Sequence, residues 1–287
     1  NTLIGAFSGD ALTTGSENVA VGYLALTGED GHGKNTAVGY GTLQAQNAGA
    51  DAYNVAVGHN AGNDITTAIQ NTLVGAGAGQ ANQTGEALTA IGYNAGFSCT
   101  ATDNTFVGEE AGFFVTSGTK NTFLGSNSGP NVSTSTASSN TGLGYFAGVK
   151  LTSGAANTLV GDRAGQSLTT GAYNTALGQN ALDADDVGFQ STAIGAMALY
   201  YQNIASADST YNTAVGYQSG YYNVTGTGNT HIGWRAGFGV SGNSHSNNTM
   251  IGYQAGQAIS TGSNNTFVGG LAGDGTDDGA ANAALGY

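Results

Sequence analysis

A five-residue phrase that returns at a nearly constant spacing limits the possible folds of this chain more than any other feature. The phrase reads Asn-Thr, then a mostly small or apolar residue, an aliphatic residue and Gly, and it occurs seventeen times in 287 residues. Eleven of the sixteen intervals between its glycines are 17 residues, three are 19, one is 21 and one is 16. A short fixed period is typical of a solenoid, in which each repeat is one coil stacked on the next. We therefore expect a single continuous array over residues 1–287, of about 17 coils, that is a segment of a longer fibre.

The repeat predicts one short strand in each coil. We number its positions from the asparagine, position zero, which is Asn in fifteen repeats; position three is always Val, Ile or Leu and position four is always Gly. An alternating run closed by glycine indicates a β-strand that enters a tight turn, so the predicted fold class is all-β, a parallel β-solenoid. Asparagine at a fixed corner predicts a ladder of side-chain amides from one coil to the next.

Both faces of the predicted strand are apolar. Position three has no exceptions, which indicates the inside of the coil, and position one shares its face. Position two would then point outward, although it is apolar in nearly every repeat. Two apolar faces predict that both are covered, most simply by copies of the same chain; the alternative is a monomer with a mildly apolar stripe. The predicted oligomer interface consists of the larger residues at position two, Leu3, Leu73, Phe106, Phe123, Leu159, His231, Met250 and Phe267.

Charge and composition exclude several kinds of partner. The net charge is −13 with only five Lys and Arg residues, which argues against nucleic acid and against anionic membranes. One cysteine, Cys99, leaves no intrachain disulfide. No apolar run reaches the length of about 18 residues that a membrane-spanning helix needs, so we expect no membrane insertion by this segment.

The sequence shows no constellation of catalytic residues. Its four histidines lack metal-ligand spacing, and the acidic stretch 274–279 occurs once, which favours a solvated turn over a calcium loop. His231 could meet its copies on a symmetry axis and hold an ion, although a packing role is the simpler interpretation. We therefore expect no enzyme activity, no metal and no cofactor.

Aromatic residues mark the most favourable place for binding a ligand. They gather at and after the longest interval, where the period is broken. Tyr and Trp present flat rings with a polar edge that suit sugars and proteins, although such rings could equally pack across coils or subunits. The candidate binding residues are Tyr200, Tyr201, Tyr211, Tyr221, Tyr222 and Trp234.

The repeat resembles the head domains of YadA-like trimeric autotransporter adhesins, whose left-handed parallel β-roll repeats the phrase Asn-Ser-x-Ala-Ile-Gly. Here the segments 35–39 and 212–216, Asn-Thr-Ala-Val-Gly, are similar to that phrase shortened by one residue. The shafts of phage tail fibres with the same repeat type are also similar. The coil here is longer than that family's usual unit, and no neck, stalk or anchor is present. The resemblance implies a left-handed roll, a homotrimer and attachment to a surface, but no particular ligand.

Together these features predict a structural or adhesive fibre segment on a bacterial cell or virion surface. The partners would be copies of the chain and a glycan or protein of a host surface, which is an extracellular setting. The alternatives are a tail fibre or extracellular filament with glycan-binding aromatic loops, an ice-binding solenoid that uses the threonines of position one, and a glycan-cleaving tailspike.

Overall fold

The computed structural model describes residues 1–132, 134–206, 208–275 and 277–286. The chain forms two compact units, residues 1–139 and 140–287. Both units are all-β, and both are parallel β-solenoids in which each repeat supplies one coil with one three-residue strand. The prediction of an all-β parallel solenoid with about 17 coils of about 17 residues is therefore confirmed. The left-handed winding, the trimer and the single continuous array stay predictions.

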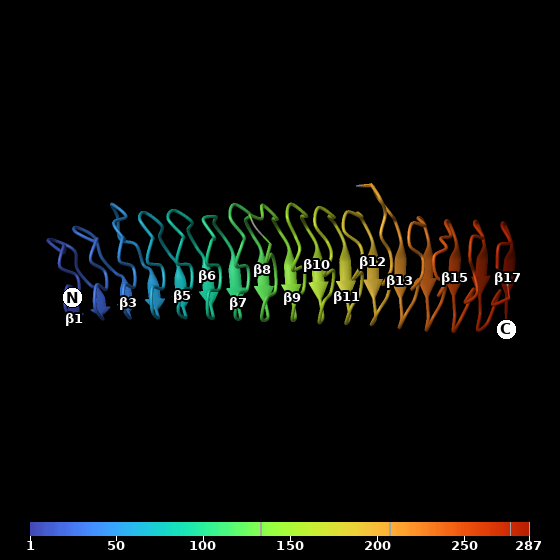
Figure 1. Cartoon of the computed structure of the whole chain (residues 1–287), viewed down its shortest axis with the longest axis horizontal. Coiled ribbons are helices and arrows are strands. Elements are labelled where there is room, and N and C mark those ends of the chain that lie inside the picture. The colour runs from blue at the N-terminus through green and yellow to red at the C-terminus, as the bar shows by residue number, and fades with distance from the viewer. Residues whose placement is uncertain (133, 207, 276, 287) are drawn as a thin grey trace. The chain divides into compact units, whose positions relative to one another are not determined.

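Eight strands lie in the described part of the first unit. Figure 1 shows them side by side, from blue to green. Consecutive strands pair in parallel, and residues at the same repeat position lie opposite each other. The strands are β1 (Thr2–Ile4), β2 (Val19–Val21), β3 (Thr36–Val38), β4 (Val55–Val57), β5 (Thr72–Val74), β6 (Thr89–Ile91), β7 (Thr105–Val107) and β8 (Thr122–Leu124).

The described residues of the second unit form nine strands with the same parallel register. Its longest interval adds residues to the loop between two strands and leaves their pairing unchanged, with Thr192 opposite Thr213. The strands are β9 (Thr141–Leu143), β10 (Thr158–Val160), β11 (Thr175–Leu177), β12 (Thr192–Ile194), β13 (Thr213–Val215), β14 (Thr230–Ile232), β15 (Thr249–Ile251), β16 (Thr266–Val268) and β17 (Ala283–Leu285).

The glycine at position four is constant because of its backbone conformation and its contact with the next coil. Gly39 has a φ of 139°, a region that residues with a side chain rarely adopt. A Cβ atom on Gly39 would lie 2.2 Å from the carbonyl oxygen of Gly58, the equivalent glycine of the following coil. Only glycine therefore allows the strand to turn while the coils stay at sheet spacing.

The predicted asparagine ladder is present and lies inside the coils. The Asn54 Oδ1 atom accepts a hydrogen bond from the backbone N–H of Asn71 (2.9 Å), and Asn71 Oδ1 accepts one from Leu88 N–H (2.9 Å). The same bond joins Asn140 Oδ1 to Asn157 N–H in the second unit (2.9 Å). These asparagines are buried, so their amides satisfy backbone groups that water does not reach.

The predicted assignment of strand faces is wrong. Position two points into the coil, and positions one and three point outward. Seven of the eight residues predicted to form an oligomer interface are buried within their own unit: Leu73, Phe106, Phe123, Leu159, His231, Met250 and Phe267. Leu3, in the first coil, is the exception and is exposed. A side chain enclosed by its own coils cannot contact another molecule, so these seven residues form core and not interface.

The reason for this direction is a match of sizes between positions two and eight. The four leucines at position eight, Leu26, Leu43, Leu182 and Leu199, are buried, and position two of the same coil is Ala in each case. Every coil with a large residue at position two instead has Gly at position eight. A Cβ atom on Gly112, for example, would lie 2.6 Å from the Phe106 ring. The two positions share one interior volume, which has room for one large side chain.

The described residues form no helix that would be long and apolar enough to cross a lipid bilayer.

Candidate functional site

The outward strand face carries two parallel rows of side chains along each unit. Position one supplies Thr, with Val19, Val55 and Ala283 as the exceptions, and position three supplies Val, Ile or Leu. Because the strands pair in register, each row repeats at the strand spacing of about 4.8 Å. The aliphatic row is open to solvent, with Val57 at 37% and Ile91 at 39% relative exposure. No charged residue interrupts either row.

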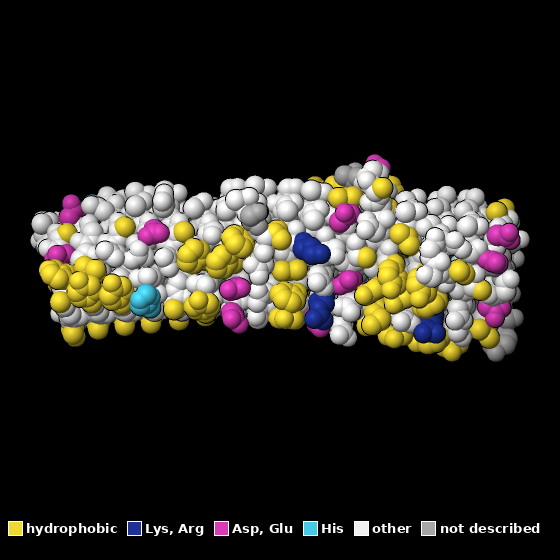
Figure 2. All heavy atoms as spheres, viewed as in Figure 1, with side chains coloured by type: hydrophobic (Ala, Val, Ile, Leu, Met, Phe, Trp, Pro, Cys, Tyr) yellow, Lys and Arg dark blue, Asp and Glu magenta, His cyan; other side chains and the backbone are white. Residues whose placement is uncertain are grey.

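Aromatic rings at position five stack from coil to coil. In the first unit Tyr23 stacks on Tyr40 (ring centroids 5.4 Å apart), and Tyr40 stacks on the imidazole of His59 (5.0 Å). In the second unit Trp234 stacks on Tyr253 at 5.0 Å. Figure 2 shows hydrophobic side chains gathered over the coils of β1–β3 and of β13–β15. Rings at the same position of successive coils are separated by the strand spacing of about 4.8 Å, which falls within the range at which aromatic pairs stack.

Most of the predicted binding residues form a second ladder at positions nine and ten. Tyr200 stacks on Tyr221 at 5.3 Å, Tyr201 stacks on Tyr222 at 5.3 Å, and Tyr221 stacks on Phe238 at 5.2 Å. Burial raises the pKa of Tyr221 to about 12, so its hydroxyl stays protonated. These rings pack across neighbouring coils, which is one of the two roles that the sequence left open for them.

Arg235 lies between the two aromatic ladders of the second unit. Its guanidinium is 4.7 Å from the ring centroid of Trp234 and 4.7 Å from that of Phe238. Its Nε donates a hydrogen bond to Gln218 Oε1 (2.8 Å). Cation–π contacts of this kind hold the guanidinium against the rings, so Arg235 connects the ladder that contains Trp234 with the ladder that contains Tyr221.

Stacking limits what the aromatic residues can offer a sugar. Neighbouring rings cover most ring faces of the ladders, so edges and hydroxyls are the parts left to a ligand. Tyr211 differs, because it is 63% exposed and has no ring partner among the described residues. The structure brings five of the six candidates into the ladders and leaves Tyr211 outside them. Binding of a glycan or protein by these residues stays a prediction.

His231 lies in the core of the second unit and cannot reach a symmetry axis. It is fully buried, and its ring centroid is 5.1 Å from that of His245, which is also buried. Burial lowers the pKa of His231 well below its usual value and lowers that of His245 to about 4. Both rings are therefore neutral at physiological pH. The burial of His231 agrees with the packing role that the sequence favoured, and it rules out the alternative of an ion held between copies of His231.

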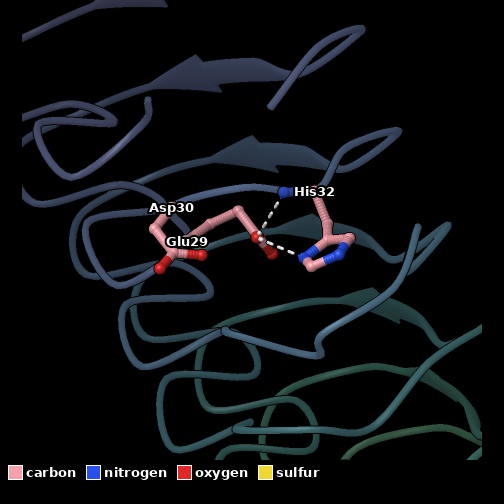
Figure 3. Close-up of side chains that lie close together, drawn as sticks. All are labelled: Glu29, Asp30 and His32. Carbon is pink, nitrogen blue, oxygen red and sulfur yellow. Dashed lines mark hydrogen bonds and ion pairs between the residues drawn. The ribbon is translucent and has the colours of Figure 1, made fainter. Parts of the chain in front are cut away.

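A cluster that sequence reasoning missed lies in the second coil of the first unit, where Glu29, Asp30 and His32 each offer a ligand atom within 4.8 Å of the others. Glu29 Oε1 accepts a hydrogen bond from the backbone N–H of His32 (3.0 Å) and lies 3.8 Å from its Nδ1 atom. Figure 3 shows the carboxylate of Glu29 directed toward the imidazole. Burial raises the pKa of Glu29.

A signal for this cluster is present in the repeat. Glu29 occupies position eleven, which is buried and aliphatic in other coils, as at Ile65, Leu151 and Leu168. A carboxylate at an interior position indicates that something compensates its charge. In the acidic stretch 274–279, Thr276 lies outside the described residues.

Comparison with protein-family models, with curated proteins and with solved structures gave no match. The described residues enclose no pocket.

Proposed function

We propose that the chain is a non-enzymatic structural segment of an attachment fibre, extracellular on a cell or virion surface, that assembles with copies of itself through the outward strand face. The observation that carries this proposal is the pair of uncharged Thr and aliphatic rows along each unit. An exposed patch of a few hundred square ångströms is often a site of contact with another protein. A homotrimer is the assembly that the resemblance to YadA-like heads implies.

A second copy of the chain is the occupant that fits these rows best. Its own rows have the same length and the same spacing, so side chains can interdigitate along the whole surface, and symmetric homo-oligomers are the commonest assemblies. Eight strands at about 4.8 Å, with two rows about 10 Å wide, present roughly 350 Å². Since a stable interface buries about 800 Å² on each partner, the rows of both units or exposed tyrosines such as Tyr23 and Tyr40 must contribute.

Sedimentation velocity of the full chain tests the proposal. The wild type should sediment as an oligomer, and a Val57→Lys/Ile91→Lys double variant should sediment as a folded monomer, because two ammonium groups would be buried in the interface. The control is Asn47→Lys/Ala50→Lys, which adds the same charge at exposed loop positions and should stay oligomeric. A monomeric wild type, or an oligomer that survives Val57→Lys/Ile91→Lys, would refute the proposed assembly.

An ice-binding function is a second candidate, because the structure places the threonine row on an exposed sheet face. The aliphatic row that shares this face with the threonines was expected inside the coil, but it lies outside. Thermal hysteresis, the difference between the melting and freezing temperatures of ice, tests ice binding directly when it is measured on the monomeric form. A hysteresis that Thr89→Tyr/Thr105→Tyr abolishes would support ice binding. No hysteresis in the monomeric form would exclude it.

A further inference from the structure

We propose that Glu29, Asp30 and His32 form a binding site for a divalent transition-metal ion of the zinc type. The proposal does not depend on the proposed function. It uses the cluster shown in Figure 3, in the loop that follows β2.

An unpaired carboxylate oxygen lies inside the coil. The side chain of Glu29 is completely buried, and its Oε2 atom has no hydrogen-bond partner. The Nδ1 atom of His32, on the same side, is also buried without a partner. Two unpaired groups with lone pairs, close together and enclosed, are unfavourable unless a cation or donor lies between them.

The equivalent carboxylate in the other unit has hydrogen-bond partners within the protein. Asp185 also occupies position eleven and is also completely buried. Its Oδ2 atom accepts a hydrogen bond from Gln202 Nε2 (2.6 Å), and its Oδ1 atom accepts one from Gly188 N–H (3.0 Å). Position fourteen of that coil is glycine, whereas the Glu29 coil has His32 there. Asp185 is therefore satisfied by protein groups, and Glu29 has instead an imidazole beside its open oxygen.

The donor set selects the kind of ion. One imidazole nitrogen with two carboxylate oxygens suits Zn²⁺ and related ions, whereas Ca²⁺ and Mg²⁺ prefer oxygen ligands alone. The side chain of His32 is 35% exposed, so the ion can enter from solvent and keep water as a further ligand. Small side-chain rotations would bring the three atoms to bonding distance, about 2.0–2.2 Å from zinc.

Isothermal titration of the full chain, without an affinity tag, with Zn²⁺ alone tests the site. The wild type should bind zinc at one site per chain. His32→Ala should weaken binding at least about tenfold, because even the loss of an outer-shell partner has that effect. Glu29→Gln should do the same. Since His32 is half-exposed, His32→Ala should keep the fold, which circular dichroism checks.

Two control variants separate this site from other acidic or imidazole groups. Asp185→Asn removes the matched carboxylate, and His59→Ala removes an exposed histidine that stacks on Tyr40. Both should bind zinc as the wild type does. No zinc binding by the wild type, or binding that His32→Ala and Glu29→Gln leave unchanged, would overturn the proposal. Absorption of bound Co²⁺ gives a second readout, because loss of the imidazole ligand should change its visible spectrum.

Discussion

Replacing Leu73 by alanine tests the direction of the strand faces. Leu73 is fully buried in β5, and its two methyl groups lie against Gly62 and Gly79. A Cβ atom on either glycine would be only 2.7 Å from a Leu73 methyl carbon. The two glycines have no side chain to fill the space that the methyl groups leave, so the side chains that could shift toward it are those beside the same glycines, such as Ile65 and Leu88.

The expected loss of stability follows from this geometry. Leu→Ala changes in cores cost about 2–5 kcal/mol, and the cost rises with the volume that stays empty. We expect Leu73→Ala to fall within that range, about 2–5 kcal/mol. The next residue, Val74, is 37% exposed, so Val74→Thr should change the free energy of unfolding by less than about 0.5 kcal/mol. If Val74 were inside the coil, its new hydroxyl would be buried without a partner at about 1–3 kcal/mol.

Urea unfolding followed by far-ultraviolet circular dichroism compares the two variants. Val74 lies on the face that we propose for assembly, and assembly would make the apparent stability depend on protein concentration. The measurement is therefore repeated at two protein concentrations, and the variants are compared by the part of the free energy of unfolding that does not change with concentration. A Val74→Thr variant as unstable as Leu73→Ala would show that the face assignment is incorrect.

Three further perturbations address individual features of the coil. Burial raises the pKa of Asp185 from 3.8 to about 6. Because the folded-state pKa lies above the unfolded value, the free energy of unfolding should fall by about 2 kcal/mol between pH 4 and pH 7, and Asp185→Asn should remove this contribution in urea titrations at both pH values. Gly39→Ala should lower the free energy of unfolding by more than about 4 kcal/mol in thermal unfolding, because the new Cβ atom would meet the next coil. Gly49→Ala is the control: Gly49 has a φ of 69° and no atom within 4 Å of an added Cβ, so this change should cost only about 1–2 kcal/mol. Asn71→Ala should cost about 1–3 kcal/mol and accelerate hydrogen exchange of the Leu88 amide, which loses its acceptor; an unchanged exchange rate would contradict the ladder.

The candidate sites could be predicted only in part. The aromatic residues stand out in the sequence, and their fixed repeat positions already place Tyr200 and Tyr221 one coil apart. Their stacking depends on the spacing of the coils and on side-chain rotation, which the sequence does not contain. The Glu29 cluster was missed because position eleven is recognised as an interior position only when the direction of the coil is known.

The amino-acid sequence by itself determined the repeat, the strand at positions one to three, the glycine turn and the asparagine ladder. Each of these depends on local backbone geometry or on contacts between equivalent residues, which a periodic pattern records directly. Only the tertiary structure decided which strand face lies inside. Both faces of a three-residue apolar strand can be buried, and only the closed coil shows which of them meets position eight. The match between position two and position eight was visible in the sequence, yet its meaning depends on knowing that Phe106 and Gly112 share one interior.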